Sequence, residues 1–222
     1  MAATEQAKTP YSEPRWPVAL TIVVALFLLA AIPGRIRLFP AWVPIAAMIL
    51  VLCPMVAVGL THARPRWLLL ERVITLLFVV LTGVAMIKIL AFLVHAMMLR
   101  PIELSGLQLL SSSIAVWVSV VLVFSLLYWQ IDRGGPGARA DRPTARPDWL
   151  FPQVGFPQEA PPDWRPTFVD YLFLSYSTAT SFSTAEVVPM TTRAKLLMML
   201  QSSISLVTIV LVASRAINIL GN

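Results

Sequence analysis

Charged residues are scarce in this chain: they make up 13% of its 222 residues, while hydrophobic residues make up 58%. A soluble globular domain carries about 25% charged residues, so the composition excludes that class and indicates an integral membrane protein. The apolar–polar alternation of barrel strands is also missing, which leaves helices as the way for the backbone to cross a bilayer. We therefore expect an all-α membrane protein.

Residues that build disulfides, metal sites and catalytic centres are also few. The chain has one cysteine, Cys53, and two histidines, His62 and His95, which excludes a disulfide framework and gives no metal-ligand spacing. Glycine-rich phosphate loops and paired carboxylates within apolar runs are absent as well. The sequence therefore predicts no catalytic residue, no metal, no cofactor and no enzyme. The net charge of +6 comes largely from arginines beside apolar runs, which favours lipid headgroups rather than nucleic acid as partners.

Long apolar runs are abundant instead, and a bilayer core takes about 20 apolar residues per helix. Five runs are near or above that length, the first being short, and we expect each to be a transmembrane helix: 16–32, 41–60, 68–99, 107–130 and 192–220. These runs divide the chain into a disordered N-terminus (1–15), a four-helix membrane region (16–130), a proline-rich extramembrane loop (131–167) and a C-terminal module (168–222). Within the loop, residues 132–167 hold eight prolines and cannot form a long helix. Four aromatic residues there indicate an extended segment, held either against the protein or in the headgroup layer.

The C-terminal module begins with a short helix, predicted over 168–180. Pro166 and Thr167 are helix-start signals, and Asp170 is favourable in the first turn. This helix is too short to cross a bilayer, so it fits a re-entrant helix. The polar stretch "TATSFSTAEVVP" follows it and leads into the last helix. Non-helical backbone at membrane depth is tolerated only where it is buried in protein or lines water.

These residues resemble the pore module of the tetrameric potassium-channel superfamily. That pattern is a short aromatic helix, the filter Thr-Val-Gly-Tyr-Gly-Asp, a proline and a final pore-lining helix. Here Asp170-Tyr171 stand near the helix start, Glu186 takes the place of the filter Asp, and Pro189 precedes the last helix. The resemblance covers about a quarter of the chain. It implies a homo-oligomer, a tetramer, because one hairpin cannot enclose a pore.

The resemblance ends at the filter, where Ser183 and Ala185 replace the two glycines. A filter of inward carbonyls needs positive φ angles, which glycine adopts at little cost and Ser or Ala do not. A potassium-selective filter is therefore not expected, and side chains would line the constriction. The filter-like loop comprises Thr180, Ser181, Phe182, Ser183, Thr184, Ala185 and Glu186. We expect a non-selective or weakly cation-preferring ion channel for monovalent cations, because a ring of carboxylates favours cations.

The alternative is a non-conducting membrane binding or assembly protein that keeps the pore-module fold. The lost glycines and Phe182 favour it, because bulky apolar residues can plug or dewet a passage. A transporter is disfavoured because no internal repeat is visible. Longer stretches, "YWQIDRGGPGARA" and "DWLFPQ" among them, resemble a family of uncharacterised bacterial multi-span membrane proteins. That family supplies no function; it is in keeping with a multi-pass protein of the cell inner (plasma) membrane.

The last helix carries a polar stripe of Gln201, Ser205 and Thr208, whose spacing places them on one face. The stripe fits pore lining, and it equally fits packing, since Ser and Thr are common contacts between membrane helices.

Lys88 is an intramembrane charge inside the third run, where an ammonium group is costly and marks a functional candidate. Glu71 and Glu186, the acidic residues near a span, are its candidate partners, and snorkelling towards the headgroups is the other interpretation. Orientation stays open, because the channel resemblance places the hairpin outside while the positive-inside rule favours the reverse.

Overall fold

The computed structural model describes residues 13–32, 40, 42–60, 65–99, 106–141, 145–162, 164–181 and 186–220. This part of the chain holds eight α-helices, one 3₁₀ helix and two short strands. In order they are α1 (Trp16–Ala31), α2 (Trp42–Leu60), α3 (Pro65–Leu99), α4 (Gly106–Ile131), η1 (Asp132–Gly134), α5 (Pro136–Asp141), β1 (Trp149–Leu150), α6 (Pro152–Gly155), α7 (Phe168–Ser181), β2 (Val188–Pro189) and α8 (Thr192–Leu220).

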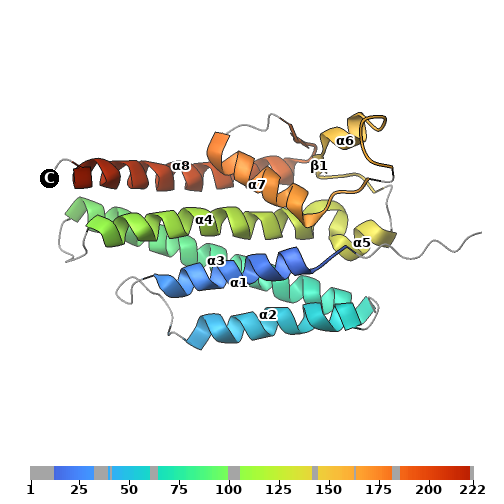
Figure 1. Ribbon diagram of the computed structural model, residues 1–222, viewed down its shortest axis with the longest axis horizontal. Coiled ribbons are helices and arrows are strands. Elements are labelled where there is room, and N and C mark those ends of the chain that lie inside the picture. Colours follow the sequence, from blue (N-terminus) through green and yellow to red (C-terminus); the bar gives the residue numbers. More distant parts are fainter. Residues whose placement is uncertain are drawn as a thin grey trace, which may run out of the picture.

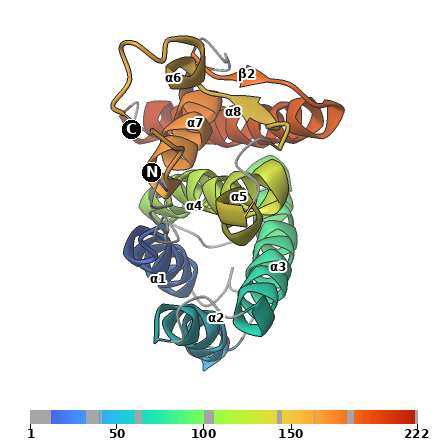
Figure 2. The same cartoon turned by 90° about the vertical axis from the view of Figure 1, so that its right-hand side faces the viewer.

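The long helices lie roughly side by side, with α4 at the centre of the bundle (Figure 1). On one side α4 packs against α7 and α8, and on the other side it packs against α1 and α3. Helix α2 is the outermost and contacts α1 and α3 (Figure 2). The core residues of α4 include Val116, Val120 and Leu126, which are at most 1% exposed. The molecule is therefore two groups of helices that share α4.

Among the described residues, four helices are long and apolar enough to cross a membrane, within Trp42–Gly59, Arg66–His95, Leu107–Gly134 and Thr192–Ser214. The all-α fold of a membrane protein is therefore confirmed, and each of the five predicted runs forms a helix close to its expected bounds. Helix α1 has 16 residues and is shorter than these four. Pro54 lies inside α2, which membrane helices tolerate because neighbouring groups satisfy the freed backbone.

Helix α7 begins beside the first turn of α8, runs obliquely along it, and stops before the other end of the bundle (Figure 1). The sequence predicted this helix over 168–180, and it spans Phe168–Ser181. The Asp170 carboxylate accepts hydrogen bonds from the Thr167 N–H at 2.7 Å and from the Thr167 hydroxyl at 2.8 Å. A carboxylate there satisfies the donor at the helix start and complements the positive end of the helix dipole.

The proline-rich loop folds into short elements and is held to the bundle by some of its aromatic side chains. Trp149 and Phe151 are buried, whereas Phe156 is 66% exposed. The Phe151 ring meets the Tyr171 ring edge-on, with centroids 5.3 Å apart. Strand β1 pairs antiparallel with β2, so that Trp149 lies opposite Pro189. The loop is thereby fixed at the start of α8, as the first of the two sequence interpretations expected.

Candidate functional site

The polar stripe of α8 lies inside the chain, at the junction of α4, α7 and α8. Gln201, Ser205 and Thr208 are all 0% exposed. The first turn of α8 exposes Arg193 and Lys195. Beyond it, the exposed large side chains described for α8 are apolar, with Leu196, Met199, Leu200, Leu206, Val207 and Val210 among them. This buried placement agrees with the interpretation that the stripe packs against neighbouring helices. For these three residues to line a path, the helices would have to move apart.

Gln201 is the centre of the junction, because its carboxamide joins all three helices. Its Oε1 accepts a hydrogen bond from the Tyr128 hydroxyl of α4 at 2.6 Å. Its Nε2 donates to the backbone carbonyl and to the hydroxyl of Ser175 in α7, both at 2.8 Å. The Ser175 hydroxyl in turn donates to the Val121 carbonyl of α4 at 2.7 Å. A buried polar network of this kind is stabilising because its members satisfy one another.

Deeper along α8, the contacts with α7 continue. The Ser202 hydroxyl donates to the Thr178 carbonyl at 3.3 Å, close to the C-terminal end of α7. The Thr208 hydroxyl donates to the Ile204 carbonyl of its own helix. The Ser205 hydroxyl is buried and has no hydrogen-bond partner among the described residues. The last turn of α7 is thus fixed against the middle of α8.

The filter-like loop is described at its two ends. Thr180 and Ser181 end α7, with Ser181 exposed, and Glu186 is an exposed residue two positions before β2. The Thr180 hydroxyl donates to the Tyr176 carbonyl at 2.8 Å. Phe182, Ser183, Thr184 and Ala185 lie outside the described residues.

Lys88 is exposed on α3, and His95 is exposed on the same helix. The proposed partner Glu71 is 1% exposed and instead pairs with Arg15, with 3.3 Å between Oε1 and Nε. Lys88 lies about 25 Å further along α3, at 1.5 Å per residue. Glu71 is therefore not the partner of Lys88, and the intramembrane charge of Lys88 stays a prediction.

A second polar cluster, which the sequence reasoning missed, lies where α4 ends. Asp132 is fully buried. Its Oδ2 accepts a hydrogen bond from the Tyr171 hydroxyl of α7 at 2.7 Å, and its Oδ1 accepts one from the Asp148 N–H at 2.7 Å. One carboxylate thus joins the end of α4, the start of α7 and the loop. The signal available in the sequence was the position of Asp132, an acidic residue that directly follows an apolar run and stands two residues before the pair Gly134-Gly135.

The N-terminal segment enters the same cluster through Glu13. Its carboxylate accepts hydrogen bonds from the Arg139 guanidinium at 3.1 and 3.2 Å and from the Trp129 indole N–H at 2.7 Å. Arg139 also donates to the Trp129 and Asp132 carbonyls. Residues 1–12 of the predicted disordered stretch lie outside the described residues. Glu13 itself is 8% exposed, so the last residues of that stretch belong to the packed structure.

A tight turn brings Arg139 back onto α4. Arg133, Gly134 and Gly135 have positive φ angles of 52°, 85° and 95°. Glycine adopts this region readily, while for arginine it is uncommon. A Cβ atom on Gly135 would also lie 3.1 Å from the Gln130 carbonyl oxygen. The turn therefore needs its glycine at position 135 both for the backbone angle and for the close approach.

Asp148 joins the loop to the first turn of α8. Its carboxylate, 1% exposed, accepts hydrogen bonds from Thr191 at 2.7 Å and from the Arg193 Nε at 2.6 Å. Burial acts to raise the pKa of Asp148, but the hydrogen bonds from Arg193 and Thr191 outweigh it, and the pKa lies below its ordinary value. Thr191 also accepts a hydrogen bond from the Ala194 N–H and so caps α8.

Comparisons with known proteins give no relative: no family model, no curated protein and no solved structure matches the chain.

Proposed function

We propose that this protein is a multi-span, channel-like membrane protein whose C-terminal hairpin, α7 with residues 182–191, enters and leaves the bilayer on one side. In this proposal α1 joins the four longer helices as a fifth span. The observation that carries it is the depth of α7. The contact of its last turn with Ser202 lies about 15 Å along α8, at 1.5 Å per residue, which is half of a hydrocarbon core of about 30 Å. Strand β2 then lies back at the start of α8, paired with β1.

The chemistry of the α7 terminus supports a wet or ionic environment. The last four carbonyls of a helix have no intrahelical donor, and the helix dipole makes this end partly negative. Ser181 is exposed, and Glu186 is the exposed acidic residue that follows. Such groups are costly in hydrocarbon. A passing monovalent cation and its water would satisfy them, with weak preference for cations over anions.

A homo-oligomer, a tetramer by analogy with the potassium-channel superfamily, is part of the proposal because one hairpin does not enclose a path. The α7 residues Val169, Phe173 and Tyr176, spaced along one face, are 48–57% exposed. In the oligomer this face would contact either lipid or the next subunit. The apolar outward face of α8 would border the rest of the path, and apolar constrictions conduct only when wetted.

A non-conducting binding or assembly protein is the second candidate, and a specific observation favours it. The polar stripe expected to line a pore is fully buried and includes the junction residue Gln201. The hairpin would then be a rigid structural element that presents Glu186 and the loop to a partner at the membrane surface.

Cation flux through purified protein in liposomes separates the two candidates. We expect flux that Ser181→Trp abolishes and that loses its cation preference in Glu186→Gln. Glu159→Gln is the matched control, because it removes the same charge from an exposed position of the loop and should leave the flux unchanged. If intact, oligomeric protein gives no more flux than empty liposomes, or if both Glu→Gln variants act alike, the channel proposal is wrong.

A further inference from the structure

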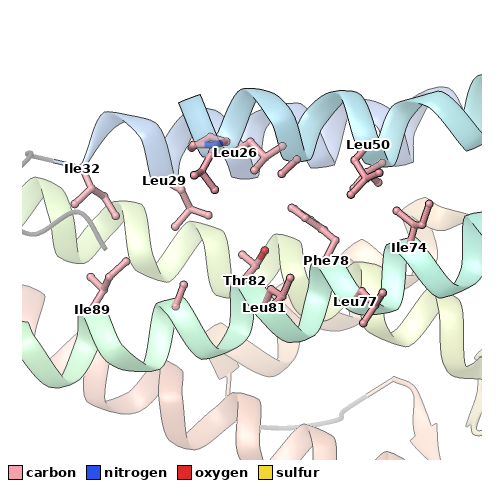
Figure 3. A pocket seen from close by; sticks show the side chains of 15 residues that line it. Leu26, Leu29, Ile32, Leu50, Ile74, Leu77, Phe78, Leu81, Thr82 and Ile89 are labelled. Atoms are coloured by element: carbon pink, nitrogen blue, oxygen red, sulfur yellow. The ribbon is translucent and has the colours of Figure 1, made fainter. Parts of the chain in front are cut away.

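An apolar cavity of about 290 Å³ lies among α1, α2 and α3, away from the hairpin. Leu26 and Leu29 of α1 border it on one side, and Phe78 of α3 projects into it from the other (Figure 3). Thr82 is its one lining residue with a side-chain hydroxyl, and that residue is 5% exposed. The cavity therefore offers almost nothing to which a water molecule could hydrogen-bond.

The size and shape of the cavity indicate a hydrocarbon chain. Its lining runs from Ile74 to Ile89 on α3, about 22 Å of helix at 1.5 Å per residue. An apolar cavity of about 150 Å³ stays dry and takes up benzene, so this space has room for roughly a dozen carbon atoms. Because this volume extends along such a length of helix, the cavity is long and narrow, like an extended hydrocarbon chain.

Three occupants come into question. A water chain would need several polar partners, whereas the described lining offers a single side-chain hydroxyl, that of Thr82. A helix from a second copy, with a diameter of about 10 Å or more, is too large for this volume. If the cavity stayed empty, its lining atoms would lose dispersion contacts. The remaining occupant is the material that surrounds α2 and α3, which are both long and apolar enough to cross a membrane, namely the acyl chains of bilayer lipid.

We infer that the cavity among α1, α2 and α3 binds one acyl chain of a bilayer phospholipid as a resident structural ligand. This acyl chain fills the space between α2 and its neighbours α1 and α3. It packs against the apolar side chains of Leu26, Phe78 and Ala85, and the headgroup of the phospholipid stays at the membrane surface. This inference is independent of whether the hairpin conducts.

The test is the phospholipid that stays bound to the purified protein. The protein is reconstituted with palmitoyl-oleoyl phosphatidylethanolamine and phosphatidylglycerol, re-extracted in a mild maltoside detergent, washed, and examined by native mass spectrometry. We expect one phospholipid per chain in the wild type and at least a tenfold lower occupancy in Ala47→Trp, whose indole would fill the cavity that Ala47 lines.

Ala46→Trp is the matched control, because Ala46 is the adjacent residue of α2 and is exposed rather than lining the cavity. It should keep one phospholipid per chain. A wild type without bound phospholipid, equal occupancy in both variants, or an apolar guest that is not a phospholipid would each overturn the inference.

A second measurement covers the case in which Ala47→Trp does not fold. Harsh detergent washing should lower the melting temperature of the wild type by several degrees, and adding the same two phospholipids should restore it. Ala47→Trp, when folded, should respond to neither step. A wild type whose melting temperature is indifferent to phospholipid would contradict a resident lipid.

Discussion

The two groups of helices that share α4 are held together by different interactions. On the α7–α8 side, buried polar groups such as Gln201 and Asp132 bond across three or more segments. On the α1–α2–α3 side, apolar side chains surround a cavity, and the Arg15–Glu71 pair joins the start of α1 to α3. Polar networks fix one arrangement because only one geometry satisfies their partners, while apolar contacts tolerate sliding and exchange. The comparison teaches that the α7–α8 side is built for a fixed geometry, while the α1–α2–α3 side leaves room for adaptable packing.

The largest expected effect comes from breaking the charged part of the polar side. Arg139→Ala leaves the Glu13 carboxylate buried with one hydrogen-bond donor fewer, and removing one partner of a buried ion pair costs about 3–5 kcal/mol. The free energy of unfolding in detergent measures this loss. Arg146→Ala, at an exposed position of the same loop, should cost less than about 0.5 kcal/mol. If the two variants lost the same free energy of unfolding, the buried Glu13–Arg139 pair would not stabilise the fold as described.

The next effect concerns the attachment of α7. Tyr171→Phe removes the hydroxyl that donates to Asp132, and hydrogen bonds to charged groups contribute about 1.5–3 kcal/mol. Tyr176→Phe is the control on the same helix, because Tyr176 is 52% exposed. We expect a lower free energy of unfolding in Tyr171→Phe alone. A loss of similar size in both would indicate a general effect of the hydroxyl rather than the bond to Asp132.

The hydrogen bond between Tyr128 and Gln201, which involves no charged group, can be tested by a double-mutant cycle. Tyr128→Phe and Gln201→Leu each break the hydrogen bond between α4 and α8. We expect each to lower the free energy of unfolding by about 1–2 kcal/mol, since partners are left buried and unsatisfied. The coupling between them should be about 0.5 kcal/mol or more. Strictly additive losses would show that the two side chains do not stabilise each other.

The smallest effect is a pH dependence at the start of α8. Because the pKa of Asp148 is lower in the folded than in the unfolded state, its stabilisation is complete above the ordinary aspartate pKa of about 4. It decreases as the pH falls through the folded pKa, where the folded protein takes up the proton.

Arg193 is 59% exposed, so Arg193→Gln should cost below about 1 kcal/mol at pH 7. It should also flatten the loss of stability below pH 4, as acid titration of the melting temperature would show. Lys195→Gln, an exposed change of the same charge two residues later, should keep the wild-type slope. A slope that is unchanged in Arg193→Gln would contradict the role of this pair.

The sequence predicted the helices well, because apolar runs, prolines and the Thr167–Asp170 start signal act locally. It left the polar stripe of α8 undecided, since periodicity shows which residues share a face and not what that face meets. It missed the Glu13–Arg139 pair because those residues are far apart in the chain and carry no spacing signal. It suggested Glu71 as a partner of Lys88, whereas Glu71 pairs with Arg15, because the sequence does not reveal that the segment before α1 lies beside the first turns of α3.

The connection between α4 and α7 is attached to the start of α8 near its middle, where β1 pairs with β2 and Asp148 bonds to Thr191 and Arg193. This attachment divides the connection into two smaller loops, one before β1 and one after it. Closing a small loop loses less chain entropy than closing a large one, so each loop tolerates added length at its own tip. Residues 157–159 form an exposed turn at one such tip. A short epitope inserted there should leave the bundle intact and be reachable by antibody from one side of a sealed vesicle only. Since the starts of α7 and α8 lie at the same end of the bundle (Figure 1), that epitope would also report the side on which the proposed hairpin opens.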